Sequence, residues 1–526
     1  MKRSSFFLFL FVAALPAAKF YADDPLLIEP TPRDVGSMQS RKLSDYYDLF
    51  LHQFTHPGER QPRGKSHPQI KAKAVNTLGD PMDGDWYNRR HYWNRMRLAE
   101  LERGPTMDSG PDVSAKLSVV GAKSEGITPG FILLDAKKRR YFVKFDPLSN
   151  PELATAADQI SSRFFYALGY WVPENHLIFF TESQLELGEN VELSDRLGKK
   201  RKMTRADLIE VLLKVPRGKD GLYRGTASLA VPGKPIGPPR YFGTRTDDPN
   251  DIVPHEHRRD QRALHVFCAW LNHDDSRAIN NLDVVIERNG VKTVRHFLLD
   301  FGSTLGSASN GPNSARSGAY YFDWGESAKN LFGLGFRVPY WARARYPRYP
   351  SIGRFEYKQF DPEQWVPEYP NPAFRNRLPD DEFWGAKQVM AFTDDEIRAV
   401  VETGRITDNA AADYLVKCLI ERRNKIGKAY YAKVLPLDRF RIRDRALAWE
   451  DLSHSLGAVN VRWHQFDNQA ERRTPLSATT PRLPQPSPTG FLCAELTAPS
   501  RPSQKIFVYL RERGGTHEIV GVDREW

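Results

Sequence analysis

The segment Asn272–Asn280 (NHDDSRAIN) combines carboxylate, amide and guanidinium side chains within one short loop. Asp275 and Asn280 are five residues apart, so one loop can present a proton acceptor and a metal ligand to the same phosphate group. Asn and Asp are also common in turns and helix caps for purely local reasons, and the segment alone fits such a capping loop equally well. The chemistry that it indicates is transfer of a phosphoryl group from a metal-bound nucleotide.

Asp300 is a second candidate metal ligand. It follows the apolar run Phe297–Leu299 and precedes Phe301 and Gly302. A carboxylate at the end of a buried strand, with a glycine close by for backbone freedom, suits a magnesium ligand. The tripeptide D-F-G occurs by chance in roughly one chain of this size in ten. The inference therefore depends on its place after the loop and a predicted hairpin.

Lys144 lies in the apolar strand Tyr141–Phe145. Burying an unpaired ammonium group is prohibitive, so Lys144 must face solvent, a carboxylate or a bound phosphate. A solvent-facing lysine at a strand edge explains the strand alone equally well. On the following helix Asp158 is the candidate partner, and Glu152 is its competitor.

The segment Gly121–Gly130 links the first two predicted strands and is rich in glycine. Gly121, Lys123, Ser124 and Gly126 could bring backbone N–H groups over nucleotide phosphates. The segment lacks the spacing G-x-G-x-x-G, and an ordinary flexible hairpin loop fits it nearly as well.

These candidates must be positioned by an α+β fold. The first half predicts strands in Lys116–Gly121 and Phe131–Phe145, the latter broken by a hairpin turn at Asp135–Arg139. A helix over Pro151–Gly169 follows from apolar residues at every fourth position. The remaining elements expected before the catalytic loop are strands His176–Thr181 and Tyr223–Val231 and helices Arg41–Phe54, Tyr92–Glu102, Leu208–Leu213 and Arg259–Leu271.

After the loop, Leu282–Glu287 and Thr293–Leu299 are expected to pair as a hairpin, because an Asn-Gly turn joins them. Gly302–Ala319 is expected to be a mobile loop. The later elements are helices Asp395–Thr403 and Asn409–Lys428, and strands Ile506–Arg511 and Glu518–Val522. Past Pro436 the short strand candidates predict a small C-terminal β domain.

The order of these motifs along the chain resembles that of the protein-kinase-like superfamily. The order is a glycine loop, a strand lysine, a helix carboxylate, the segment H-x-D-x-R-x-x-N and D-F-G. The resemblance covers residues 116–306 with motifs. It is closest to the divergent atypical branch, which includes HipA-like, CotH-like and phosphoinositide-kinase-like proteins. Asp274 stands where the usual motif has arginine, no A-P-E follows D-F-G, and a long insertion precedes the catalytic loop.

The resemblance implies a two-lobed fold, with a small antiparallel β lobe and a larger helical lobe. It implies that Asp275 is the catalytic base, with Arg277 at the motif's lysine position, and that Asn280 and Asp300 bind metal. Lys144 would hold the phosphates of ATP, with Mg²⁺ or Mn²⁺ as the metal. The acceptor would be a hydroxyl on a protein, lipid or carbohydrate. Two alternatives stay open: AMP transfer on the same fold, and a secreted pseudokinase that only binds or scaffolds.

The N-terminus predicts export. Lys2 and Arg3 precede the 13-residue apolar run Phe6–Ala18, which has the length of a secretory signal. Ala17, Ala18 and Ala22 are candidate cleavage sites. We expect a periplasmic or extracellular protein, with an uncleaved membrane anchor as the alternative. The predicted division is a signal at 1–22, an extension at 23–114, lobes at 115–239 and 240–436, and the β domain at 437–526.

The formal charge of +11 is spread along the chain as scattered arginine pairs. Removal of residues 1–22 takes away Lys2, Arg3 and Lys19 and leaves +8. Nucleic-acid binding usually needs a gathered basic stripe, so we do not expect it. A mildly basic surface favours phosphate-bearing ligands or weak association with an anionic membrane.

The three cysteines do not suggest a disulfide framework or a metal site. Cys268 and Cys418 lie in helical apolar patterns, which predicts that both are buried. His255-Glu256-His257 resembles a metal-ligand pair, but no further ligand is near in the sequence, so we expect no metal there.

Overall fold

The computed structural model describes residues 18–44, 49–64, 67–122, 130–194, 200–332, 338–485 and 489–526. The chain forms two compact units. One comprises Leu27–Val75 and Asp80–Lys433, and the other comprises Met1–Leu26, Asn76–Gly79 and Val434–Trp526. The first carries every candidate site residue.

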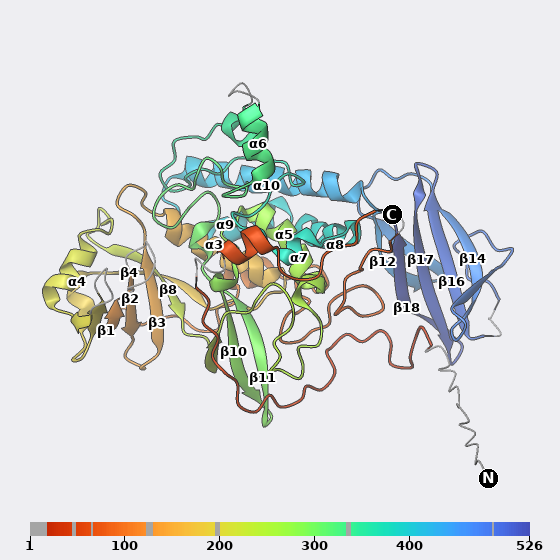
Figure 1. Ribbon diagram of the computed structural model, residues 1–526, viewed down its shortest axis with the longest axis horizontal. Coiled ribbons are helices and arrows are strands. Elements are labelled where there is room, and N and C mark those ends of the chain that lie inside the picture. The colour runs from red at the N-terminus through yellow and green to blue at the C-terminus, as the bar shows by residue number, and fades with distance from the viewer. Residues whose placement is uncertain are drawn as a thin grey trace, which may run out of the picture. The chain divides into compact units, whose positions relative to one another are not determined.

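A six-stranded sheet forms the small lobe of the first unit (Figure 1). Its strand order is β4-β8-β3-β2-β1-β5. All neighbouring strands are antiparallel except β1 and β5, which are parallel. The strands are β1 Leu117–Ala122, β2 Gly130–Leu134, β3 Arg140–Phe145, β4 Asn175–Phe180, β5 Leu185–Leu187 and β8 Tyr223–Leu229.

The two faces of this sheet carry different helices. Side chains alternate along β3, so Tyr141, Val143 and Phe145 enter a core that includes Leu208 and Leu212 of helix α4 (Arg205–Leu212). Lys144 is therefore on the opposite face.

Helix α3 (Leu153–Ala167) covers that opposite face. Thr226 of β8 pairs with Lys144 in the sheet register, and its hydroxyl donates to the Thr155 carbonyl of α3 at 3.2 Å. The sheet and α3 thus fix where the Lys144 ammonium can reach.

The helical lobe is built around α5 (Arg259–Leu271), which is buried along its whole length. It packs against α8 (Pro379–Met390) and α10 (Asn409–Tyr431), and α10 also contacts α9 (Asp394–Glu402). Arg422 of α10 donates to the Trp270 carbonyl at 2.9 Å and to the Ala269 carbonyl. These bonds satisfy carbonyls at the end of α5 and fix the start of the following loop.

After α5 the chain forms the 3₁₀ turn η4 (Ala278–Asn280) and the hairpin β10 (Asn281–Arg288)–β11 (Val291–Leu298), which β9 (Lys234–Gly237) extends. The turn η5 (Phe301–Ser303) follows β11. The smaller elements of this unit are η1 Leu51–Thr55, α2 Leu98–Arg103, η2 Glu182–Gln184, β6 Glu192–Ser194, β7 Lys200–Lys202, η3 His255–His257, α6 Trp324–Phe332, η6 Tyr340–Arg343 and α7 Pro372–Arg375.

The second unit is a β domain. Its five-stranded sheet has the order β15-β14-β16-β17-β18, beside the two-stranded sheet β12-β13. Phe20, from the N-terminal segment, is buried among Phe466, Cys493, Tyr509 and Val520 of this domain. The strands are β12 Leu437–Arg443, β13 Ala446–Asp451, β14 Asn460–Asp467, β15 Arg472–Pro475, β16 Phe491–Ala498, β17 Arg501–Arg513 and β18 Thr516–Glu525.

The predicted α+β fold is confirmed, with a small, largely antiparallel β lobe, a larger helical lobe and a C-terminal β domain. Helix Arg259–Leu271 has the predicted bounds, and Cys268 and Cys418 are buried as predicted. The helix expected over Arg41–Phe54 is wrong at its start, because residues 41–44 are not helical. No helix in the described part of the chain has the length and apolarity of a membrane span. The predicted signal run falls almost entirely on residues 1–17, outside the described residues.

Candidate active site

Lys144 and Asp300 form the centre of the site. They are 156 residues apart in sequence, and the Lys144 Nζ lies 2.6 Å from the Asp300 Oδ1. Burial by itself would lower the pKa of Lys144, but the carboxylates of Asp300 and Asp158 outweigh that effect and raise it. The ammonium group is therefore firmly protonated at the junction of the sheet lobe and the D-F-G turn.

Asp158 lies beside this pair without taking the predicted position. Its Oδ1 accepts the backbone N–H of Phe301 at 3.1 Å, and it acts on Lys144 through its charge. The hydrogen bond of Lys144 that the sequence assigned to Asp158 goes to Asp300 instead. Asp158 is one methylene shorter than Glu, and its carboxylate fastens the D-F-G backbone to α3. Glu152 points elsewhere, because its Oε2 accepts the Thr407 N–H at 2.9 Å.

The backbone of Asp300 adopts a left-handed conformation, with φ 57° and ψ 63°. Non-glycine residues rarely adopt it, and such strain persists only where the surroundings impose it. Phe301 supplies the constraint, since its fully buried ring stacks on Phe165 of α3 at 5.0 Å between ring centroids. The buried His273 side chain lies 6.0 Å from the Phe301 ring, and its Nδ1 is 3.4 Å from the Ser303 carbonyl. His273 thus braces the D-F-G turn.

Asn280 lies next to Asp300 across the hairpin. The N–H of Leu299, the residue before Asp300, donates to the Asn280 carbonyl at 2.9 Å. The Asn280 amide nitrogen donates to the Asp275 carbonyl at 2.7 Å, which leaves the amide oxygen as its ligand atom. The backbone of Asn280 therefore lies beside the residue that precedes Asp300, and the Asn280 side chain closes the loop that carries Asp275.

The donor set fits a hard divalent cation. The described residues contain no group of three or more His, Cys, Asp or Glu that could hold a metal ion. Mg²⁺ needs no such group, because it is usually held by one or two carboxylates together with nucleotide phosphates and waters. Asp300 and Asn280 would hold it here, and the ion would neutralise phosphate charge.

Asp275 and Arg277 interact directly, since the Arg277 Nε donates to the Asp275 Oδ1. The Arg277 guanidinium also lies over the ring of Tyr369, 5.1 Å from its centroid. Arg277 thereby holds the Asp275 carboxylate in place, and Tyr369 holds Arg277.

A carboxylate pair that the sequence analysis missed lies behind this loop, formed by the buried Asp274 and the half-buried Glu368. Asp274 accepts hydrogen bonds from Asn313 at 2.9 Å and Ser317 at 2.6 Å, and the Glu368 N–H donates to its carbonyl at 2.9 Å. Burial and the nearby Glu368 carboxylate raise the pKa of Asp274 to about 7. Burial and Asp275 likewise raise the pKa of Glu368. Asp274, in the place of the motif's arginine, therefore ties the predicted mobile loop 302–319 to the catalytic loop.

The predicted phosphate loop is only partly described. Gly121 lies in β1 opposite Ile132, and a side chain there would crowd the Ile132 side chain at 3.1 Å. Lys123, Ser124 and Gly126 lie outside the described residues. Their role in nucleotide binding stays a prediction.

The histidines of η3 have other partners. The His255 Nε2 is 2.7 Å from an Asp251 oxygen, and the His257 Nε2 is 2.7 Å from a Glu59 oxygen. The Glu256 carboxylate accepts the Glu59 N–H at 2.8 Å and the Gly243 N–H at 2.7 Å. This network fastens residues near the N-terminus to the helical lobe.

Comparison with known proteins gives a weak structural likeness. No family model matches the sequence, and neither does any curated protein. A crystal structure of the Golgi casein kinase with Mn/ADP bound is similar over 63% of this chain and 73% of its own, with 10% identity and a TM-score of 0.29. A second crystal structure of the Golgi casein kinase is similar over 63% of this chain and 72% of its own, with 9% identity and a TM-score of 0.31. The assignment of the site rests on its own geometry.

Proposed function

We propose that this chain is an ATP- and metal-dependent phosphotransferase of the atypical kinase-like type. The observation that carries the proposal is the 2.6 Å pair of Lys144 and Asp300, with Asp158 and Asn280 beside it. A phosphate-holding cation, a metal-ligand pair and a nearby carboxylate are the groups that phosphoryl transfer requires.

In the proposed reaction the oxygen of an acceptor hydroxyl forms a bond to the γ-phosphorus of ATP. The bond from that phosphorus to the bridging oxygen breaks, and ADP leaves. Asp275 receives the hydroxyl proton, and Arg277 keeps its carboxylate oriented. Lys144 balances negative charge on the phosphates. Phe301 and His273 hold Asp300 in its constrained conformation.

Thermal melting with nucleotide tests the binding half of this proposal. ATP with Mg²⁺ or Mn²⁺ should raise the melting temperature of the wild type, and Asp300→Ala should abolish the increase because it removes the metal ligand. A ligand at 100 times its Kd stabilises by about 2.7 kcal/mol, which such melts resolve. Asp413→Ala is the control, because Asp413 is a surface carboxylate with a 64% exposed side chain. Equal increases in all three proteins would contradict the metal assignment.

Labelled ATP tests the chemical half. Transfer of label from the γ-phosphate, lost in Asp275→Ala, supports a kinase. Transfer from the α-phosphate alone would replace it with AMP transfer. Binding of nucleotide without any transfer would point to a pseudokinase.

We also infer that the protein acts after export from the cytoplasm. The support is the apolar run Phe6–Ala18 behind Lys2 and Arg3. In an exported enzyme the acceptor hydroxyl belongs to a molecule of the secretory route, the periplasm or the exterior.

A further inference from the structure

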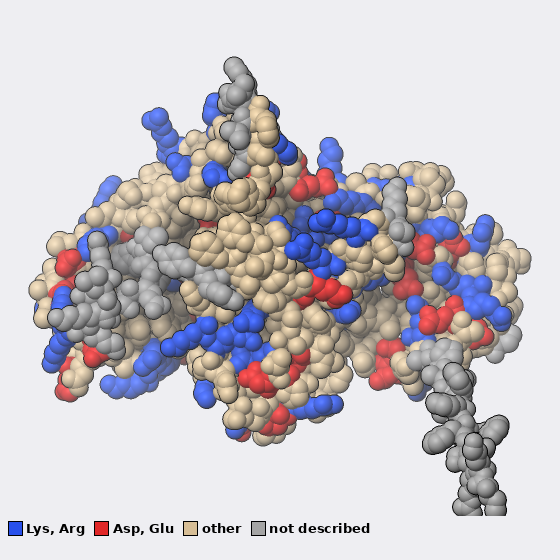
Figure 2. All heavy atoms as spheres, in the orientation of Figure 1, with Lys and Arg blue, Asp and Glu red and all other residues tan. Residues whose placement is uncertain are grey.

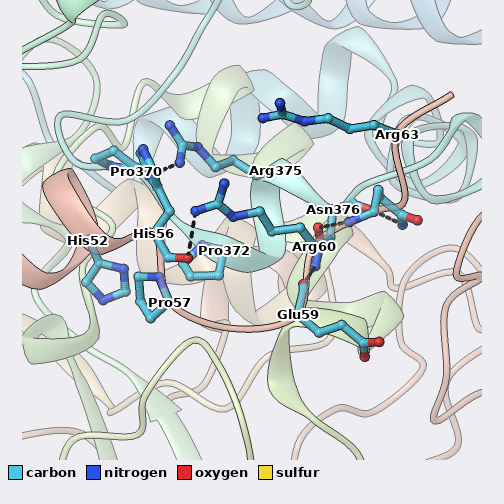
Figure 3. A pocket seen from close by; sticks show the side chains of 11 residues that line it. His52, His56, Pro57, Glu59, Arg60, Arg63, Pro370, Pro372, Arg375 and Asn376 are labelled. Atoms are coloured by element: carbon cyan, nitrogen blue, oxygen red, sulfur yellow. Dashed lines mark hydrogen bonds between the residues drawn. The ribbon is translucent and has the colours of Figure 1, made fainter.

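A pocket of about 290 Å³ opens on the first unit, and neither Lys144 nor Asp300 lines it (Figure 3). Two segments form it, one around η1 and one around α7. Its volume is at the small end of the range for ligand sites, about 300 Å³ and above. Its lining residues include Arg60, Arg63, Arg375, His56, Glu59 and Pro370.

Three arginines give the pocket its charge. In Figure 3 the side chains of Arg60, Arg63 and Arg375 extend along the same side of it. Figure 2 shows Lys and Arg side chains gathered near the position of α7 on this face. Like charges placed this close repel one another, and a bound anion removes that cost.

The other polar residues of the pocket do not neutralise the positive charge of these arginines. Burial, followed by the charges of Arg375 and Arg60, lowers the pKa of His56, so its ring is neutral at pH 7 and accepts a hydrogen bond from Arg375. Glu59 lies 2.7 Å from His257 and points away from the guanidinium groups in Figure 3. Among the described residues, no carboxylate forms an ion pair with Arg60, Arg63 or Arg375.

The pocket adjoins the catalytic loop. Pro370 lines the pocket, and Glu368 donates its N–H to the Asp274 carbonyl at 2.9 Å. Tyr369, between them, lies under the Arg277 guanidinium. Two residues span at most about 7 Å, so a molecule held in the pocket lies within reach of the loop that carries Asp275.

We propose that this pocket binds a phosphate monoester group carried by the acceptor molecule. The proposal rests on the proposed phosphotransferase function and deepens it, because it names the acceptor as a phosphorylated compound. Guanidinium groups match the geometry of phosphate oxygens through paired N–H donors, and charge-assisted bonds of this kind are the strong ones. The acceptor hydroxyl would then extend from the pocket toward Asp275.

Calorimetric binding without ATP or metal tests the pocket. The probes are inorganic phosphate and glycerol 3-phosphate, with glycerol as the neutral reference. The variant is Arg60→Gln with Arg375→Gln. The matched control is Arg103→Gln with Arg513→Gln, which removes the same charge from two exposed arginines outside the pocket. We expect both phosphates to bind the wild type and the control equally, and to bind the pocket variant about tenfold or more weakly.

Three results would overturn the proposal. Equal binding to both double variants would place the phosphate elsewhere. Failure of both phosphates to bind the wild type would show that the pocket is not a phosphate site. Binding of inorganic phosphate but not of glycerol 3-phosphate would make the pocket a free-anion site. Melting with Mg-ATP, run on the same variants, keeps the two proposals separate: an unchanged response in the pocket variant leaves the nucleotide site intact whatever the calorimetry shows.

Discussion

Asp274 is a residue whose protonation should control stability. Its pKa of about 7 in the folded protein exceeds the ordinary value of 3.8. Between about pH 4 and pH 7 the folded protein therefore keeps a proton that the unfolded chain has lost. The contribution of Asp274 to the free energy of unfolding therefore falls as pH rises through that window, by up to about 4 kcal/mol. Above the window this contribution stays constant.

Asp274→Asn removes this titration while keeping the size of the side chain. We expect the difference between the melting temperatures of the variant and the wild type to shift in favour of the variant as pH rises from 4 to 7. Asp413→Asn, which removes an exposed carboxylate, should run parallel to the wild type. Parallel curves for Asp274→Asn as well would show that Asp274 titrates normally.

At this scale the sequence singles out candidate site residues without fixing which of them pair. Lys144, Asn280 and Asp300 were proposed because each sits in a strand or loop with a local motif. Glu368 was missed because it lies in a proline-rich stretch without periodicity, and only the folded chain brings it to Asp274. Which carboxylate pairs with Lys144 depends on how α3 is rotated about its axis. The spacing of apolar residues shows which face of α3 is buried, but it does not show which single side chain reaches Lys144.

The Phe301 ring is the aromatic contact that holds the turn η5 to α3, beside the hydrogen bond from the Phe301 N–H to Asp158. Phe301 is fully buried against Phe165. Phe301→Ala should lower the free energy of unfolding of this unit by about 3–5 kcal/mol, because it leaves a cavity in the core. Urea unfolding measures the change.

Phe142→Ala on β3 is the matched control, since the Phe142 side chain is 45% exposed. It should cost less than about 1 kcal/mol. Similar losses in both variants would mean that the stack between η5 and α3 does not stabilise the lobe.

Most elements could be predicted where the apolar period was clear. Strands β1, β2 and β3 and helix α5 follow alternation and four-residue spacing directly. Helix α8 was missed because its first turn, PDDE, is acidic and buried, with Asp380 and Asp381 facing Arg259 of α5. Such ion pairs mask the amphipathic pattern, and no local rule reveals them.

At the scale of the whole molecule, the burial of Phe20 bears on the processing of the proposed export signal. Phe20 is 4% exposed within the β domain, and its backbone bonds Asn468 at 2.9 Å and 2.8 Å. Cleavage after Ala22 would delete this residue, whereas cleavage after Ala18 would keep it. We expect the exported protein to begin at Lys19, as mass spectrometry of its N-terminal peptide would show.

Two purified forms of the protein test whether the buried Phe20 ring stabilises the β domain. A chain that begins at Asp23 should melt at a lower temperature in its β domain than one that begins at Lys19, because a core ring is lost. Phe20→Ala in the longer form should reproduce most of that decrease. An exported protein that begins at Asp23 and melts like the longer form would contradict this account.

The burial of Cys268, Cys418 and Cys493 has a consequence for how the protein matures. In all three, burial raises the pKa of the thiol, so little reactive thiolate forms. All three are free thiols in the folded protein, so its stability does not depend on a disulfide between them. A reducing agent should therefore leave that stability unchanged.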